Sequence, residues 1–142
     1  MQLINYKIEA YIKFQPDSIE KMLFLCEEAA ESITMDKSAR FKLKCAIHEL
    51  VANSVEHGYS KGCGLVSVTL RKLDDSIYFE VCDQGSSLNL SDLDLEKDID
   101  SISEATPRGW GLRMIKKLSR DFTISNNSPK GTKISLHIPL SI

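Results

Sequence analysis

The sequence predicts an α+β fold in which one mostly antiparallel sheet carries helices on one face. Three observations favour this class. Apolar and polar residues alternate at the start of the chain, two long stretches then show helical spacing, and short alternating segments recur in the second half. A period of two is typical of half-buried strands, whereas a period of 3.6 indicates amphipathic helices. The resulting order, β-α-α-β-β, a long loop, then α-β-β, predicts helices packed against a single sheet.

The first half of the chain provides one strand and two helices. Residues 3–14 alternate and predict a half-buried strand. Residues 16–33 predict an amphipathic helix that begins at Pro16, a residue suited to the first helical turn. Asp36 is a candidate cap for a second helix, which runs to about Glu56 before the stop signal of Gly58. We expect this second helix to bury a set of five side chains: Phe41, Cys45, Leu50, Val51 and Val55.

The second half predicts two hairpins and one helix. Residues 65–73 and 76–83 alternate on either side of the Asp74-Asp75 turn, which predicts a β-hairpin. A helix is predicted from Gly109 to about Leu118. A strand around residues 122–124, a turn over residues 126–131 and a final strand around residues 134–138 complete the chain.

Size and composition indicate a single soluble domain. The 142 residues suit one domain spanning 1–142, with 42% apolar and 27% charged residues, as in soluble globular proteins. A net charge of -2 predicts no general attraction to nucleic acid or to an anionic membrane. No apolar run approaches the ~20 residues of a transmembrane helix, and the four cysteines form no C-x-x-C pair. We therefore expect a cytoplasmic protein with reduced thiols.

An acidic segment separates the first hairpin from the third helix. Residues 86–108 carry six acidic residues against only Lys97 and Arg108. A connection of this length in a compact domain is usually functional or disordered. Two interpretations stand side by side, a solvated acidic loop and a lid over a ligand.

The second helix contains the segment HELVANSVEHGY, in which Glu49, Asn53 and His57 recur at one helical turn. Such a polar stripe is most often only the solvent-exposed face of a helix, but apolar residues closely surround the stripe in this segment. Glutamate suits general-base chemistry, and the asparagine carbonyl oxygen suits Mg²⁺, which takes few protein ligands in nucleotide sites. His57 is more often a helix-end residue that interacts with the dipole.

Three further motifs are weak singly. In VCDQGSS, Asp83 ends a strand and Gly85 follows, so a carboxylate could accept a hydrogen bond from an exocyclic amine beside an open backbone. In PRGWGL, Gly109 and Gly111 lie at the start of a helix, where free N–H groups bind phosphate. Gly131-Thr132 precedes the last strand, and ordinary hairpin turn chemistry is a strong explanation for this pair.

The order of these motifs along the chain is more specific than any one motif alone. E-x-x-x-N on a helix, D-x-G after a hairpin, a long loop, R-G-x-G-L and finally G-T resemble the Bergerat fold of the GHKL ATPases, a two-layer α/β sandwich. The resemblance covers nearly the whole chain. Within this superfamily the short chain is most similar to the anti-sigma-factor serine-protein kinases.

The resemblance implies a role for each motif residue. It assigns Asn53 to Mg²⁺ and Glu49 to the base that activates the attacking hydroxyl. It places Asp83 on the adenine amine, with Gly85 beside the ring. The remaining nucleotide-binding residues that it implies are Arg108, Gly109, Gly111, Leu112 and Thr132, with residues 86–108 as the ATP lid. The chain departs from fuller versions of the motifs at Ser87, where a second glycine is usual, and at Pro107.

The resemblance also implies partners. Members of this family bind a sigma factor and phosphorylate a serine on a small antagonist protein, which then releases them, and a homodimer is implied. An alternative remains a regulator that binds its partner without phosphorylating it, through a weak or vestigial nucleotide site. A third interpretation, coincidental motifs on a plain structural domain, requires five elements to fall in order by chance.

Overall fold

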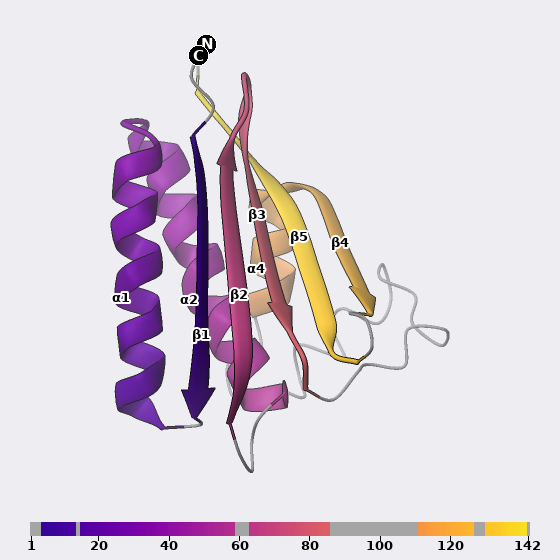
Figure 1. Cartoon of the computed structure of the whole chain (residues 1–142). Helices are drawn as coiled ribbons and strands as arrows, with labels where there is room; N and C mark the ends of the chain where they lie inside the picture. Colours follow the sequence, from indigo (N-terminus) through magenta and orange to yellow (C-terminus); the bar gives the residue numbers. More distant parts are fainter. Residues whose placement is uncertain (1–3, 14, 59–62, 86–110, 127–129, 142) are drawn as a thin grey trace.

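The chain folds into one antiparallel sheet with helices behind it (Figure 1). The computed structural model describes residues 4–13, 15–58, 63–85, 111–126 and 130–141. The elements in chain order are β1 (Asn5–Lys13), α1 (Pro16–Ile33), α2 (Lys37–Gly58), β2 (Cys63–Lys72), β3 (Ser76–Asp83), α4 (Gly111–Leu118), β4 (Arg120–Asn126) and β5 (Thr132–Pro139). The predicted fold class and element order are confirmed.

The strand order is β1-β2-β3-β5-β4, and each neighbouring pair is antiparallel. The predicted hairpin of β2 and β3 closes through a hydrogen bond from Leu73 N–H to the Ser76 carbonyl, 2.8 Å long. β5 then inserts between β3 and β4, so that the end of β3 lies beside the beginning of β5, with Cys82 opposite Lys133. This insertion joins two segments that are far apart in the sequence.

Local signals explain where the helices begin. Pro16 occupies the first turn of α1, where its missing N–H removes no hydrogen bond. Asp36 caps α2, because its Oδ1 accepts a hydrogen bond of 3.1 Å from Ala39 N–H. Arg40 then donates to the carbonyl of Thr34 over 2.6 Å and ties the start of α2 to the end of α1.

The core lies between the sheet and the helices. α1 packs on β1, β2 and α2, whereas α2 also packs on β3, β5 and α4. The largest fully buried side chains come from both layers: Phe79, Met22, Ile33, Leu43, Ile47, Leu50, Leu70, Ile77, Ile115, Leu136, Ile138 and Val51. Burying each such side chain is worth about 1.5–3 kcal/mol. The helices and the sheet are therefore held together as one unit.

The prediction that Phe41 is buried in the core is wrong. Phe41 is 66% exposed, although Leu50, Val51 and Val55 are buried as predicted and Cys45 is half-buried. α2 has α1 on one side and the sheet on another, and Phe41 lies on the remaining face, which it shares with the exposed His48 two turns later. An apolar residue on a long helix is buried only if a neighbouring element covers its face.

Four chain segments converge at one end of the molecule. Figure 1 shows the C-terminal end of α2, the end of β3, the beginning of β5 and the N-terminal end of α4 at the same lower end of the sheet. Among the described residues, no helix is long and apolar enough to cross a membrane.

Candidate functional site

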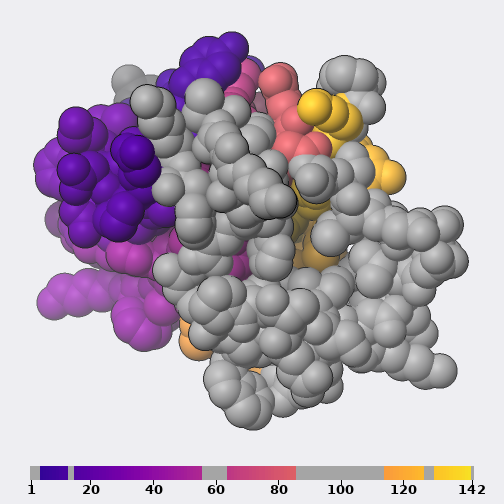
Figure 2. Space-filling model, turned by 90° about the horizontal axis from the view of Figure 1, so that it is seen from below, coloured from indigo at the N-terminus to yellow at the C-terminus, as the bar shows by residue number. Residues whose placement is uncertain are grey.

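The convergent end of the fold holds most of the described residues that the motifs single out. α2 carries Glu49 and Asn53 in its C-terminal half, β3 ends at Asp83, and β5 begins at Thr132. α2 packs directly on β3, β5 and α4. Seen from that end, atoms from the end of β3 adjoin atoms of β5 (Figure 2).

Asn53 presents an unusual polar atom. The residue is only 6% exposed, and no donor among the described residues forms a hydrogen bond to its Oδ1. A buried oxygen without a hydrogen bond costs about 1–3 kcal/mol, so such atoms are rare in folded proteins. Because a carbonyl oxygen is a ligand that Mg²⁺ accepts, Asn53 fits a magnesium ion bound with a nucleotide.

Glu49 lies one helical turn before Asn53 and is half-buried. Burial, and after it the negative charge of Glu49, raises the pKa of the Cys45 thiol above its usual value. Cys45 is therefore a neighbour of the Glu49 carboxylate, whereas the sequence assigns it only a place in the core. A half-buried carboxylate on the helix that carries a metal-compatible oxygen can accept a proton from a hydroxyl group.

Asp83 is held in place by two backbone donors. The residue is 4% exposed, and its Oδ1 accepts hydrogen bonds from Gly85 N–H at 3.0 Å and from Thr132 N–H at 3.3 Å. The first bond bends the chain immediately after β3, and the second joins the end of β3 to the beginning of β5. The structure thus brings together Asp83, Gly85 and Thr132, which the sequence placed in two separate motifs.

Gly131 explains how β3 and β5 come so close at this point. Its φ is +108°, and an added Cβ would lie 2.0 Å from the carbonyl oxygen of Asp83. Only glycine allows this backbone approach. Sequence reasoning treated Gly131 as ordinary turn chemistry, and the structure shows that it also fixes the surroundings of Asp83. The G-T pair before the last strand was the available signal.

The phosphate side of the predicted site is described only in part. Gly111 opens α4, and Leu112 follows in the same helix. α4 packs on α2, the helix that carries Asn53. Arg108, Gly109 and the predicted lid over residues 86–108, including Ser87 and Pro107, lie outside the described residues. The side chain of His57 also lies outside them.

The comparisons with known proteins agree with this arrangement. Residues 12–138 match the family described as "Histidine kinase-like ATPase domain". The chain is 28% identical over 113 residues to the anti-sigma F factor of Bacillus velezensis, covering 76% of this chain and 73% of that protein. It is 31% identical over 99 residues to the serine-protein kinase RsbW of Staphylococcus epidermidis, covering 66% of this chain and 61% of that protein.

A more extended match is weaker in identity. The anti-sigma F factor of Caldanaerobacter subterraneus subsp. tengcongensis is 23% identical over 128 residues, covering 87% of this chain and 85% of that protein.

Proposed function

Because this chain belongs to the histidine kinase-like ATPase domain family, we propose that it binds ATP with Mg²⁺ and transfers the terminal phosphoryl group to a serine of a partner protein. The similar proteins that are named as anti-sigma F factors and as serine-protein kinases support this proposal. The observation that carries it is the buried Asn53 Oδ1, which has no donor among the described residues and lies on a helix packed against the strands of Asp83 and Thr132.

In the proposed ATP site, we assign binding of the adenine base to the fixed carboxylate of Asp83. Its Oδ1 is occupied by the N–H groups of Gly85 and Thr132, so the orientation of the carboxylate is set before a ligand arrives. An ionised carboxylate accepts hydrogen bonds and donates none. Asp83 therefore selects a base that presents an exocyclic amine, as adenine does.

In the same site, we assign binding of the phosphates and the metal ion to α2 and α4. Asn53 would hold Mg²⁺, which, when bound, would neutralise phosphate charge during transfer. The N–H groups at the start of α4, where Gly111 leaves the backbone open, would bind phosphate oxygens. We assign Gly109, Arg108 and Leu112 to the same side.

Glu49 would act as the base. Its place one turn from Asn53 puts a carboxylate close to the proposed metal ligand. In this role it accepts the proton of the serine hydroxyl as the oxygen attacks phosphorus, and the ADP oxygen leaves with the former bonding electron pair. We further propose that the phosphorylated protein is an antagonist of an anti-sigma factor, and that the chain itself sequesters a sigma factor.

The test of the proposed reaction uses Glu49→Gln, which keeps the size of the side chain and removes its charge. The variant should bind Mg-ATP as the wild type does, but transfer to a candidate antagonist should fall by roughly 10²–10⁴-fold, the usual contribution of a general base. Mass spectrometry of the antagonist after incubation with Mg-ATP measures the transfer.

Two results would contradict the assignment. Equal transfer by Glu49→Gln would remove Glu49 from its role. Binding of Mg-ATP by the wild type without transfer to any candidate antagonist would favour the alternative, a regulator that binds its partner without phosphorylating it.

A further inference from the structure

The face of the sheet opposite the helices carries polar side chains on β3. The helices lie on one side of the sheet (Figure 1). Along a strand, successive side chains point to opposite faces. On β3, buried side chains toward the helices therefore alternate with half-buried ones on the outer face: Tyr78, Glu80 and Cys82. The proposed ATP site uses none of these three residues.

Glu80 is the centre of a network on this outer face. Its Oε1 accepts a hydrogen bond of 2.7 Å from the Tyr78 hydroxyl and lies 3.2 Å from Lys133 Nζ, on β5. Its Oε2 accepts a hydrogen bond of 3.6 Å from the Cys82 thiol. The Arg71 guanidinium, on β2, lies over the Tyr78 ring, 5.7 Å from the ring centroid. The network therefore joins three neighbouring strands, β2, β3 and β5.

The protonation states of these groups agree with the contacts. Burial alone would raise the pKa of the Glu80 carboxyl, but hydrogen bonds from Tyr78 and Lys133 and the charge of Lys133 lower that pKa below its ordinary value. Burial, and after it the charge of Glu80, raises the pKa of the Cys82 thiol to about 11. At neutral pH Glu80 is therefore ionised and Cys82 is a donor. Because the Glu80 side chain is only 19% exposed, salt screens its ion pair less than it screens a fully exposed pair.

The ion pair between Glu80 and Lys133 lies beside the end of the ladder that joins β3 and β5. The paired register of the two strands ends with Cys82 opposite Lys133. The next residues along the strands are Asp83 and Thr132, which are joined by the hydrogen bond from Thr132 N–H to Asp83 Oδ1. The ion pair thus lies within a few residues of the carboxylate to which we assign adenine binding.

The bond from Thr132 to Asp83 is sensitive to the distance between the strands. Its length of 3.3 Å lies just beyond the usual range of about 2.7–3.2 Å for an N–H···O hydrogen bond. A small further separation of β3 and β5 would therefore break it. Gly131 allows the two backbones to approach at this point, but it supplies no side chain that could hold them together. The ion pair on the outer face supplies such an attraction.

We propose that Glu80 and Lys133 are positioning residues for the nucleotide, an inference that rests on the proposed ATP site. Their ion pair holds the beginning of β5 against the end of β3, so that Thr132 N–H stays bonded to Asp83 Oδ1. The carboxylate of Asp83 then keeps the orientation in which it receives the adenine amine. Both residues act through Asp83 from the opposite face of the sheet.

Two variants that change the charge in opposite directions test this role. Lys133→Met removes a positive charge, Glu80→Gln removes a negative charge, and each breaks the ion pair. Calorimetry of the full chain should show that both raise the dissociation constant of Mg-ATP, by roughly three- to tenfold. A general effect of charge on the triphosphate would differ in sign, because Glu80→Gln would then strengthen binding. Lys133→Arg keeps the ion pair and should bind as the wild type does.

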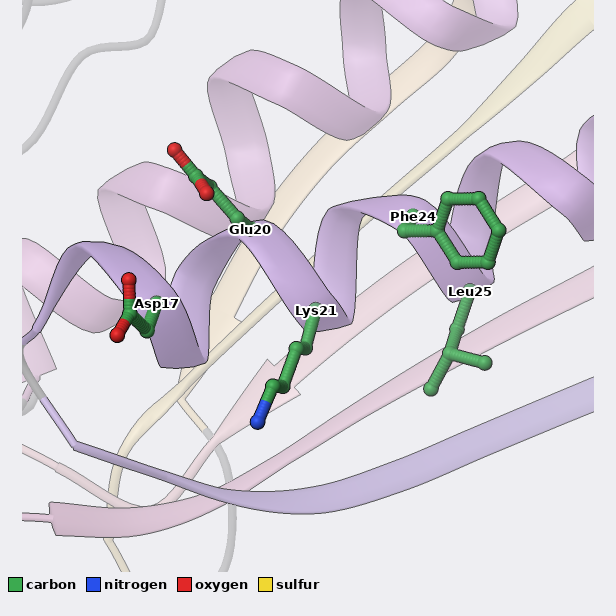
Figure 3. A pocket seen from close by; sticks show the side chains of 5 residues that line it. All are labelled: Asp17, Glu20, Lys21, Phe24 and Leu25. Atoms are coloured by element: carbon green, nitrogen blue, oxygen red, sulfur yellow. The ribbon is translucent and has the colours of Figure 1, made fainter.

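Lys21→Met is the matched control for Lys133→Met. It makes the same substitution at an exposed lysine of α1, a helix that packs on β1, β2 and α2. Figure 3 shows Lys21 projecting from α1 beside a shallow hollow, on the side opposite to Glu20. This variant should bind Mg-ATP with the affinity of the wild type.

Amide hydrogen exchange tests the same role without nucleotide. In Lys133→Met the Thr132 amide should exchange several-fold faster than in the wild type, because the bond to Asp83 opens more often. The amide of Ile138, near the other end of β5, should keep its exchange rate. Lys133→Arg and Lys21→Met should leave both rates unchanged.

The outcomes separate the positioning role from the ATP site itself. Failure of the wild type to bind Mg-ATP would refute the proposed site and the positioning role with it. If the wild type binds, wild-type affinity in Lys133→Met or Glu80→Gln would overturn only the positioning role. An unchanged Thr132 exchange rate, or equal acceleration at Ile138, would overturn it too, since the effect on Thr132 must be local.

Discussion

Two buried polar side chains near the convergent end of the fold differ in how their oxygens are satisfied. Asp83 Oδ1 accepts hydrogen bonds from the N–H groups of Gly85 and Thr132, whereas Asn53 Oδ1 has no donor within the described part of the chain. A satisfied carboxylate is consistent with a structural role as well as with binding. A buried oxygen without a donor destabilises the fold unless a ligand binds to it. Asn53 is therefore the stronger indication of a binding site.

Gly131 gives a prediction at the same scale. In Gly131→Ala the new Cβ meets the carbonyl oxygen of Asp83, and alanine rarely adopts a φ of +108°. We expect the free energy of unfolding to fall by about 1–3 kcal/mol or more, because the backbone must leave a position that only glycine allows. Chemical denaturation measures this loss.

The same substitution should weaken nucleotide binding, because β5 must move away from β3 and lengthen the bond between Thr132 and Asp83. Lys130→Ala is the matched control, since Lys130 is exposed beside Gly131 and should tolerate the change. Equal stability of the Gly131→Ala and Lys130→Ala variants would show that the close backbone approach is not required.

At the scale of elements, α2 connects the start of the fold to the site. Asp36 caps its first turn, and the helix packs on β3, β5 and α4. Asp36 Oδ2 also accepts a hydrogen bond from Ser141 N–H, so the same carboxylate holds the C-terminal end of the chain. Loss of this cap would loosen the helix that positions Glu49 and Asn53.

The cap gives a pH-dependent prediction. Hydrogen bonds from Ala39 N–H and then from Ser141 N–H hold the pKa of Asp36 below its ordinary value of about 3.8. A lowered pKa stabilises the fold above the unfolded-state pKa, and this stabilisation is lost as the pH falls through the folded-state pKa. Asp36→Ala should therefore be less stable than the wild type at neutral pH, and the difference should shrink below about pH 3.8.

Thermal unfolding across this pH range measures the effect. Asp36→Asn is the control, because asparagine still caps a helix but does not titrate in this range. A stability difference between Asp36→Ala and the wild type that stays constant down to the lowest pH would contradict the role of the ionised carboxylate.

At the scale of the whole molecule, local patterns determined much of what could be predicted. Alternation and helical spacing predicted the strands and helices, and Pro16 and Asp36 marked where the first two helices begin. The strand order was not predictable in this way, because the insertion of β5 between β3 and β4 depends on contacts between distant segments. The exposed position of Phe41 was missed for the same reason, since only the neighbouring elements decide which face of α2 is covered.

The site shows the same limit. Glu49 and Asn53 could be found because one helical turn separates them, and Asp83 because it ends a strand before a glycine. Local patterns could not predict that Thr132 donates a hydrogen bond to Asp83, or that Gly131 makes this approach possible. Both depend on pairing between strands that are far apart in the sequence. The burial of Asn53 likewise depends on how α2 packs against the rest of the fold.

Calorimetry of Mg-ATP binding tests the central claim most directly. Wild type should bind, and Asp83→Asn should weaken binding by roughly ten- to hundredfold, because a hydrogen bond to a charged group is worth about 1.5–3 kcal/mol. In that variant the amide would turn an N–H group toward the adenine amine. Asn53→Ala should remove the dependence of binding on Mg²⁺. Failure of the wild type to bind, or wild-type binding by both variants, would contradict a nucleotide site at this end of the fold.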